Sequence, residues 1–332
     1  MMEIVSFQYE HAEEARQIAR NNYEEERKHN PVLPEIDILP DLKFFAEVGL
    51  GVAAIEDECM LGYLCAWPPI EDAFNTTGVK GTFVPIHAHG VRGDLPEKVR
   101  EKLYSGMYQA AAEKWVREGI LSHGISLYTH DAPALTSFFT NGFGMRCIDA
   151  IRPMEKLVSL EVVLPEGVKV SYRELPREQW IRLLPMHNAL RAHLGCSPAF
   201  MRFPSITEDE MYQGAGEDIR YFAAEVKGQD IAYIKLGKAG ETFVSEVNDI
   251  MNICGAYCIP EFRGKGIFHN LLAYLITILQ NEGYLYLGVD MESINPNARS
   301  FWRKYFIEYT NSVVRRIDDK AIIQPEINKR KS

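Results

Sequence analysis

Residues 252–268 read Asn-Ile-Cys-Gly-Ala-Tyr-Cys-Ile-Pro-Glu-Phe-Arg-Gly-Lys-Gly-Ile-Phe. The β-forming and small residues before Pro260 predict a strand. Apolar residues at helical spacing from Ile267 to Leu279 predict a helix. The turn between them, residues 263–266, holds two glycines, an arginine and a lysine. Glycine adopts backbone conformations that a Cβ forbids, and a helix start presents free N–H groups to an anion. The stretch therefore predicts a cradle for a pyrophosphate.

Two common phosphate-binding motifs do not fit this turn. A Walker A loop needs Gly-x-x-x-x-Gly-Lys-Ser/Thr, but Ile259 stands five positions before Gly264, and Lys265 is followed by Gly266. A dinucleotide fingerprint needs a third glycine, and His269 stands in its place. The residues themselves exclude both motifs.

Residues 260–266 read Pro-Glu-Phe-Arg-Gly-Lys-Gly, and residues 295–302 read Asn-Pro-Asn-Ala-Arg-Ser-Phe-Trp. The first run resembles motif A of the GNAT superfamily of acyl-CoA-dependent N-acyltransferases, with Phe268 in the place of the motif's last Gly/Ala. The second run is similar to the family's Asn-x-x-Ala-x-x-Phe-Tyr segment, with Trp302 in the place of the Tyr. A helix and a strand are predicted between them, as the family requires. The chain is thus identified as resembling a GNAT protein.

The order of predicted elements in the first half of the chain recurs in the second half. Glu118-Gly119 and Phe138-Phe139 recur as Glu282-Gly283 and Phe301-Trp302 at a nearly constant offset. A repeat this long indicates duplicated domains rather than a solenoid. Together with the resemblance, it predicts an α/β protein of two tandem GNAT-like domains, each a mixed, mostly antiparallel twisted sheet flanked by helices. We expect one domain over 1–157 and the other over 165–332.

The two predicted domains differ at the phosphate-binding turn. Where the second carries its cradle, the first reads Gly-Val-Arg-Gly-Asp-Leu-Pro-Glu over residues 90–97. Asp94 and Glu97 place negative charge at the helix start, and Pro96 removes an N–H donor. We expect the first domain to be degenerate, and the second to bind the cofactor.

Composition and charge limit the possible partners. The 332 residues have a net charge of −10, which argues against a general nucleic-acid or anionic-membrane surface. Residues 1–10 lack the basic start and apolar run of a signal peptide, and no apolar helix is long enough to span a bilayer. A cytoplasmic location is the expectation. The six cysteines include no Cys-x-x-Cys pair, so we predict core packing rather than a metal site.

The resemblance implies acetyl-CoA as cofactor and direct attack by an amine on its thioester. The acceptor would be a primary amine on a small molecule or peptide. The strand end would meet the pantetheine arm, the glycine turn would meet the pyrophosphate, and the asparagine that opens the second motif would contact the pantetheine. The implied cofactor-binding residues are Tyr257, Cys258, Ile259, Arg263, Gly264, Lys265, Gly266, Ile267, Phe268 and Asn295.

The implied acid and base are harder to assign, because Trp302 replaces the family's proton-donating Tyr. Tyr305, one helical turn on, is the substitute. The family's carboxylate base would lie near Asn252, which is not basic, so Asp249 or Glu246 is expected to reach the site directly or through water. Asn252 stays a candidate by position.

Two further carboxylates, Asp290 and Glu292, follow the next predicted strand and are candidates for holding the substrate amine. The alternative hypothesis is a CoA-binding or interaction module with little turnover, since a clear acid and base are missing. Thiol release with some amine distinguishes the two.

Overall fold

The computed structural model describes residues 2–213, 216 and 218–322. Among these, the chain forms two compact units. The N-terminal unit comprises residues 2–31, 37–146 and 309–322, and the C-terminal unit comprises 32–36 and the described part of 147–308. Each unit contains strands, helices and buried apolar side chains.

The N-terminal unit contains two groups of strands. The strands β1, β2, β3 and β5 pair antiparallel in that order, while β6 pairs parallel with β4 and antiparallel with β13. Their bounds are β1 Glu3–Ser6, β2 Val52–Glu56, β3 Cys59–Leu64, β4 Gly81–Val84, β5 His89–Val91, β6 Ser122–Tyr128 and β13 Ile307–Arg316.

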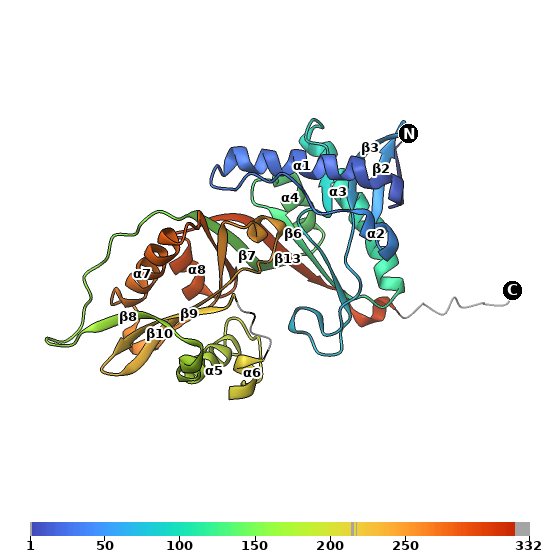
Figure 1. Cartoon of the computed structure of the whole chain (residues 1–332). Helices are drawn as coiled ribbons and strands as arrows, with labels where there is room; N and C mark the ends of the chain where they lie inside the picture. Colours follow the sequence, from blue (N-terminus) through green and yellow to red (C-terminus); the bar gives the residue numbers. More distant parts are fainter. Residues whose placement is uncertain (1, 214–215, 217, 323–332) are drawn as a thin grey trace. The chain divides into compact units, whose positions relative to one another are not determined.

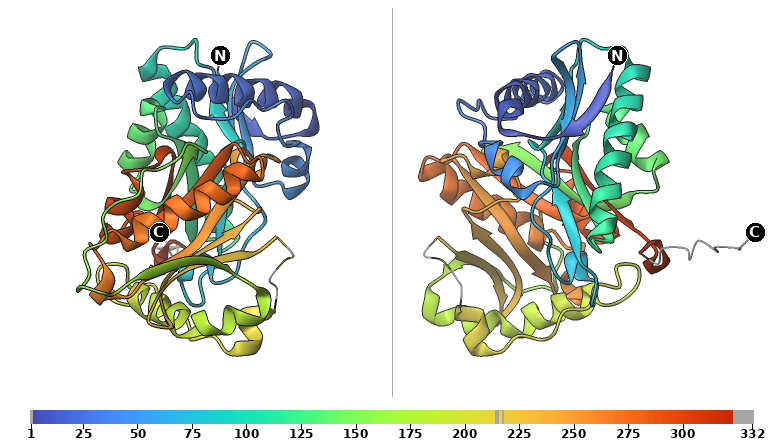
Figure 2. Two further views of the ribbon diagram at one scale, coloured as in Figure 1. Left: turned by 60° about the vertical axis from the view of Figure 1, so that its left-hand side comes forward. Right: turned by 90° about the vertical axis from the view of Figure 1, so that its right-hand side faces the viewer.

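Helices cover both faces of the first group of strands. Figure 2 shows α1 on one face and α3 on the other. The buried side of α3 carries large aromatic side chains: Tyr108 packs edge-on against Trp115 of the same helix and against Phe138 of α4, with ring centroids 6.1 Å and 5.8 Å apart. The helices are α1 Ala12–His29, α2 Lys43–Val48, α3 Glu97–Arg117 and α4 Ala132–Thr140, with short 3-10 turns at Tyr9–His11, Ala73–Asn75 and Asp319–Ala321.

The strands of the C-terminal unit follow the order β7-β12-β11-β10-β9-β8. Only the β11–β12 pair within it is parallel among the registered pairs, as expected for a mostly antiparallel sheet. The strands are β7 Gly144–Pro153, β8 Val170–Leu175, β9 Arg220–Val226, β10 Gln229–Gly237, β11 Ile250–Cys258 and β12 Tyr286–Glu292.

In the C-terminal unit, α7 and α8 lie over one face of this sheet, and α5 and α6 lie over the other (Figure 1). The inward side of α7 is wholly apolar at the predicted positions, with Leu271, Leu275 and Leu279 fully buried. The helices are α5 Leu184–Leu194, α6 Glu208–Tyr212, α7 Ile267–Asn281 and α8 Pro296–Trp302, with 3-10 turns at Arg177–Leu183, Phe243–Glu246 and Pro260–Phe262. The predicted α/β class is confirmed.

The compact units do not follow the expected linear division at 157–165. Strand β7, which closes the first half of the chain, pairs along residues 147–153 with β12 of the second half. Strand β13, which closes the second half, pairs along residues 310–316 with β6 of the first half. Each unit therefore takes its last strand from the other half of the sequence.

The parallel pairing of β11 with β12 is short. Its last registered pair is Ile253 with Val289, and beyond it β11 continues to Cys258 beside β10. A register shift in β10 at Lys235 and Leu236 lies opposite the same point. We call the place after Ile253 and Val289 the fork. Before the fork, β11 and β12 are paired neighbours; beyond it, their registered pairing ends.

Gly288 of β12 lies directly opposite Asn252 of β11 in the parallel pair and is packed tightly against it. A Cβ there would lie 2.2 Å from Oδ1 of Asn252, and the Asn252 amide is fixed because it donates to Lys238 O and Ser245 O at 2.9 Å and 2.8 Å. We expect Gly288→Ala to lower the free energy of unfolding by about 1–3 kcal/mol through overpacking, measured by urea denaturation. Gly255→Ala is the control, since its Cβ would meet its nearest neighbour at 3.5 Å; equal losses would contradict the packing argument.

Candidate functional site

The predicted strand, glycine turn and helix are present as β11, residues 259–266 and α7. Gly264 has φ +72° and Gly266 has φ +79°, a left-handed backbone conformation that favours glycine. Gly266 is the N-cap of α7, so the first N–H groups of the helix follow it directly. The sequence motif thus folds into a helix start that suits an anion.

A cavity of about 390 Å³ lies beside this helix start. Its walls come from the end of β11, the glycine turn, the first turn of α7, and α8 with the turn that follows it. The structure brings eight of the predicted site residues together on its lining: Tyr257, Cys258, Arg263, Gly264, Gly266, Phe268, Asn295 and Tyr305. The cavity also includes Trp302 and His269.

Three predicted cofactor residues are not on this lining. Ile259 packs against an apolar cluster that includes Trp180 of the 3-10 turn Arg177–Leu183 and Met186 of α5, and Ile267 is fully buried in the core. Lys265 places its Nζ 5.6 Å from the centre of the Phe262 ring. Their backbone N–H groups belong to the turn, but their side chains face elsewhere.

Residues 158–163, which we call the strap, run across the start of α7. Leu160 exchanges two hydrogen bonds with the side chain of Asn270, at 2.8 Å and 2.9 Å. Val163 N donates to Lys265 O at 3.2 Å, and a Cβ on Gly266 would lie 2.8 Å from Glu161 O. Because the strap also supplies Leu160 to the cavity wall, the linker between the two halves of the sequence is part of the site.

Two predicted cofactor residues, Arg263 and Asn295, also make hydrogen bonds to the backbone of the site. The Arg263 guanidinium donates from Nε to Cys258 O at 2.9 Å and lies 5.3 Å from the centre of the Tyr257 ring. Asn295 is the N-cap of α8, and its Oδ1 accepts from Ala298 N at 3.4 Å. Arg263 thus brings positive charge to the strand end, while Asn295 shapes the opposite wall.

The two departures from the family pattern, Phe268 and Trp302, occur together in space. The Phe268 ring packs edge-on against Phe301 and Trp302, with centroids 4.8 Å and 5.9 Å apart. Trp302 is 5% exposed. The large residue on α7 is therefore matched by an aromatic cluster on α8, and the cavity beside them stays open.

Tyr305 reaches the cavity and is held by a histidine. Its hydroxyl lies 2.7 Å from Nδ1 of His269, whose Nε2 lies 2.8 Å from the strap carbonyl of Val158. Burial raises the pKa of Tyr305, although the positive charge of Arg152 opposes this shift. Reading the sequence alone missed His269, because its partner Tyr305 is 36 residues away and no local pattern joins them.

The other predicted catalytic residues are not brought to this cavity. Asp249 is exposed and precedes β11, at the end of that strand opposite the glycine turn. Nine strand residues at about 3.3 Å each separate it from the turn. The side chain of Asn252 is used in backbone hydrogen bonds to Lys238 and Ser245. Extended strand geometry therefore removes both from reach of the cavity.

Asp290 lies at the fork, directly after Val289. Burial of the carboxyl group, followed by the like charges of Asp149, Glu241 and Glu292, raises the pKa of Asp290 to about 7. The residue nevertheless keeps an exposed surface, so solvent and ligands can reach it. Burial raises the pKa of Cys254, the first residue of β11 after the fork, and the negative charge of Asp290 adds to this rise.

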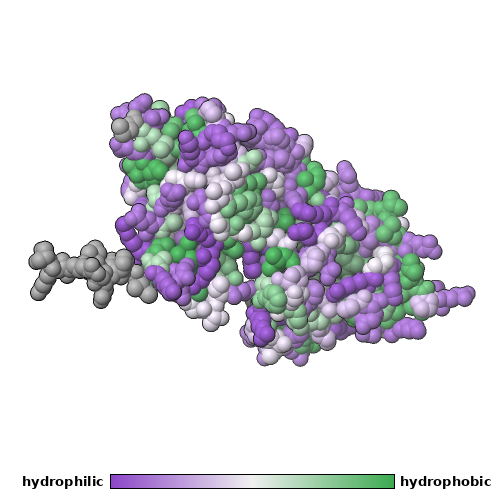
Figure 3. All heavy atoms as spheres, turned by 180° about the vertical axis from the view of Figure 1, so that it is seen from behind, coloured by the Kyte–Doolittle hydropathy of each residue, from purple (hydrophilic) through white to green (hydrophobic). Residues whose placement is uncertain are grey.

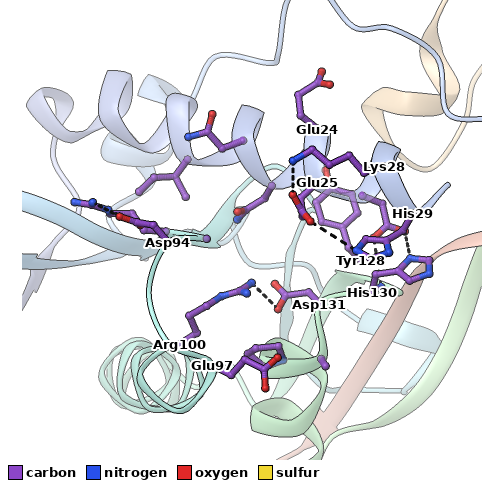
Figure 4. A pocket seen from close by; sticks show the side chains of 18 of the residues that line it. Glu24, Glu25, Lys28, His29, Asp94, Glu97, Arg100, Tyr128, His130 and Asp131 are labelled. Atoms are coloured by element: carbon purple, nitrogen blue, oxygen red, sulfur yellow. Dashed lines mark hydrogen bonds and ion pairs between the residues drawn. The ribbon is translucent and has the colours of Figure 1, made fainter. Parts of the chain in front are cut away.

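The N-terminal unit has a larger cavity, of about 920 Å³, between α1, the turn before α3, and the start of α4 (Figure 4). Its lining includes seven carboxylate side chains and three lysine or arginine side chains. Each of the three cations is already paired: Lys28 with Glu25 at 2.8 Å, Arg92 with Asp94 at 2.6 Å, and Arg100 with Asp131 at 3.1 Å.

The helix start in this cavity is unlike the one in the C-terminal unit. The N-cap of α3 is Pro96, and Glu97 lies in its first turn. Since proline has no N–H and the carboxylates repel anions, the arrangement disfavours a pyrophosphate. Figure 3 shows one face of the molecule, on which hydrophilic side chains lie among scattered apolar patches.

Comparisons with known proteins agree with this fold. Residues 188–306 match the acetyltransferase (GNAT) family model. A GCN5-related N-acetyltransferase from Sphaerobacter thermophilus is 12% identical with a TM-score of 0.55, the match covering 95% of each chain. The chain therefore has the fold of that GCN5-related N-acetyltransferase, and residues 188–306 are similar to the GNAT acetyltransferase family.

Two further solved structures are similar over most of their length. A GNAT-family acetyltransferase from Colwellia psychrerythraea is 11% identical with a TM-score of 0.47, over 96% of this chain and 100% of that one. A tandem GNAT protein from the clavulanic acid biosynthesis pathway is 10% identical with a TM-score of 0.43, over 95% and 98%. No curated protein sequence matches the chain. Within the described residues, no helix combines the length and apolar character needed to cross a membrane.

The strap depends on Asn270, which is 8% exposed and binds both backbone groups of Leu160. We expect Asn270→Ala to speed hydrogen exchange at the Leu160 amide about fivefold, since a lost hydrogen bond is worth roughly 1 kcal/mol. The measurement is amide exchange followed by NMR or mass spectrometry. Asn281→Ala, at the exposed end of the same helix, is the control and should leave Leu160 unchanged. An unchanged amide in Asn270→Ala would show that the strap is held by other contacts.

Proposed function

We propose that the chain is an N-acetyltransferase that takes its acetyl group from acetyl-CoA and passes it to a primary amine of a small molecule or peptide. The observation that carries this proposal is the cavity at the start of α7, where the two left-handed glycines, the end of β11 and α8 meet. The GNAT family match over residues 188–306 supports it.

The acyl donor would be held chiefly by backbone. The N–H groups that follow Gly264 and Gly266 would meet the pyrophosphate, with Lys265 and Arg263 supplying positive charge. The strand end at Tyr257 and Cys258 lies beyond the last registered pair of β11 with β12, so the pantetheine amides would pair along the edge of β11 that faces away from β10. Pairing of this kind fixes the thioester relative to the fork, and holding reactants in line lowers the barrier substantially.

Asp290 is the residue best placed to take a proton from the incoming ammonium. It lies at the fork, and its raised pKa makes it a useful base near neutral pH. Its carboxylate neighbours Asp149 and Glu292, which face it across the β7–β12 pair and along β12, favour a cationic acceptor. Asp290 replaces Asp249 in this role, because Asp249 is at the wrong end of β11.

We assign to Tyr305 the protonation of the departing sulfur. Trp302, in the family's Tyr position, has an indole N–H that does not ionise usefully. Tyr305 lines the same cavity one turn further on. The second candidate function is acetyl-CoA binding without turnover, which the substitution of Trp302 favours.

The first test is calorimetric titration of acetyl-CoA into the wild type, Gly266→Glu and Lys265→Glu. We expect one site per chain with a Kd in the micromolar range, lost in Gly266→Glu and weakened about tenfold in Lys265→Glu. Lys265→Glu keeps the turn's glycines, which guards against a folding defect in Gly266→Glu, where any side chain meets the strap. Gly93→Glu, at the corresponding turn of the N-terminal unit, is the control and should bind normally.

Two sites per chain would show that the N-terminal unit binds the donor as well. If wild type does not bind acetyl-CoA, the proposed function is wrong. Binding without thiol release, for any amine in a broad panel, would favour the second candidate function.

The second test follows from Asp290. A carboxyl group with a pKa of about 7 is protonated below that pH, so kcat/KM should fall about tenfold per pH unit below 7 and level off above it. Asp290→Asn should lower kcat/KM roughly 10²-fold at pH 8, and its kcat/KM should no longer fall as the pH drops below 7. The amine used as acceptor should have a pKa well above 8, so that its own ionisation does not change kcat/KM within the pH range measured.

Asp249→Asn is the matched control, because Asp249 is exposed and remote from the fork. Its pH profile should equal that of the wild type. A limb near pH 7 that persists in Asp290→Asn would assign the base to another group.

A further inference from the structure

We propose that His269 and Tyr305 act as one proton carrier: after Asp290 has taken the first proton from the ammonium, the carrier takes the second proton, which the attacking nitrogen releases, and delivers it to the departing sulfur. This inference rests on the proposed acetyl transfer and adds to it a residue outside both GNAT motifs. His269 acts through Tyr305 and is therefore a positioning residue, whereas Tyr305 faces the cavity.

The strap determines which nitrogen of His269 carries its proton. A backbone carbonyl only accepts hydrogen bonds, so Nε2, 2.8 Å from Val158 O, must be the N–H donor. In the neutral ring Nδ1 is then bare, and the Tyr305 hydroxyl, 2.7 Å away, donates to it. The remaining lone pairs of the phenol oxygen are thus available to an N–H group in the cavity.

The two protonation states of His269 give Tyr305 two opposite roles. With neutral His269, the phenol oxygen accepts a proton from nitrogen while its own proton passes to Nδ1. With the imidazolium that results, Nδ1–H donates to the phenol oxygen, and the hydroxyl is free to donate to sulfur. The carrier returns to its first state when that proton has moved on.

The overall step balances. Nitrogen forms a bond to the thioester carbon, and the carbon–sulfur bond breaks with its electron pair going to sulfur. One proton leaves nitrogen through Tyr305 and one reaches sulfur through Tyr305, so His269 and Tyr305 end as they began. Nitrogen and sulfur are bonded to the same carbon during the exchange, so one hydroxyl can serve both.

The surroundings favour prompt return of the proton. His269 is 8% exposed, and the Val158 carbonyl stabilises either form of its ring through Nε2–H. Arg152, 4% exposed and anchored by bonds to Pro153 O and Glu155 O at 3.1 Å and 2.7 Å, places a fixed positive charge that acts on Tyr305. The imidazolium of His269 adds a second positive charge near that of Arg152. It is therefore short-lived, and the proton is passed to the thiolate.

His269→Asn and His269→Gln separate this role from a structural one. Asn places its amide oxygen near the position of Nδ1 and keeps the bond from Tyr305. Gln places its amide nitrogen near the position of Nε2 and keeps the bond to the strap. Neither amide takes up a proton. We expect both variants to lose about 10²-fold in kcat, with KM for both substrates and acetyl-CoA affinity within about twofold of wild type.

Tyr305→Phe should lose as much, and the double variant with His269→Asn should lose no more than either single variant, because the two residues act as a unit. If either amide variant keeps kcat within about threefold of wild type, or if the two losses multiply, the carrier proposal is wrong.

Long-range ¹H–¹⁵N NMR of the imidazole rings gives a readout that needs no turnover. The His269 signals, assigned by their loss in His269→Gln, should show the Nε2–H tautomer with a bare Nδ1. An Nδ1–H tautomer would overturn the carrier even in an active enzyme. If the wild type binds acetyl-CoA but releases no thiol with any amine, the proposed function itself fails, and the carrier fails with it. An active wild type with an active His269→Asn rejects the carrier alone.

Discussion

The C-terminal unit depends on a parallel strand pair that stops early. β11 and β12 are in register from Ile250 to Ile253, and they approach closely there because Gly288 has no side chain to meet Asn252. Beyond the fork, the backbone of β11 has lost its neighbour on one side. Since buried backbone groups must find hydrogen-bond partners, such a fork suits an extended ligand with amide groups, and the cavity beside the glycine turn lies at its open end.

The linker between the halves of the sequence is part of the site rather than a spacer. Its residues 158–163 bond to the first turn of α7 and line the cavity through Leu160. The same strap fixes the ring of His269 through the Val158 carbonyl. One short segment therefore influences both the proposed donor site and the orientation of Tyr305.

The two units show how one fold accommodates different electrostatics. Both have a cavity at the start of the helix that follows the corresponding strand. In the C-terminal unit that start has two left-handed glycines and basic side chains. In the N-terminal unit it has Pro96 and Glu97, and the cations on the cavity wall are paired with carboxylates. The helix dipole is alike in both, so the side chains determine which charge each cavity accepts.

The sequence by itself determined the α/β class and the strand–turn–helix at residues 250–281 with two glycines in its turn, because periodicity and glycine spacing are local properties of the chain. Tertiary structure decided the rest. The strand pairing of β7 and β13 joins residues far apart in sequence, so each compact unit includes residues from both halves of the chain. Strand length carries Asp249 away from the turn, and side-chain packing commits Asn252 to the backbone. The contact of His269 with Tyr305 exists only because α7, α8 and the strap meet in space, and no spacing within the sequence encodes it.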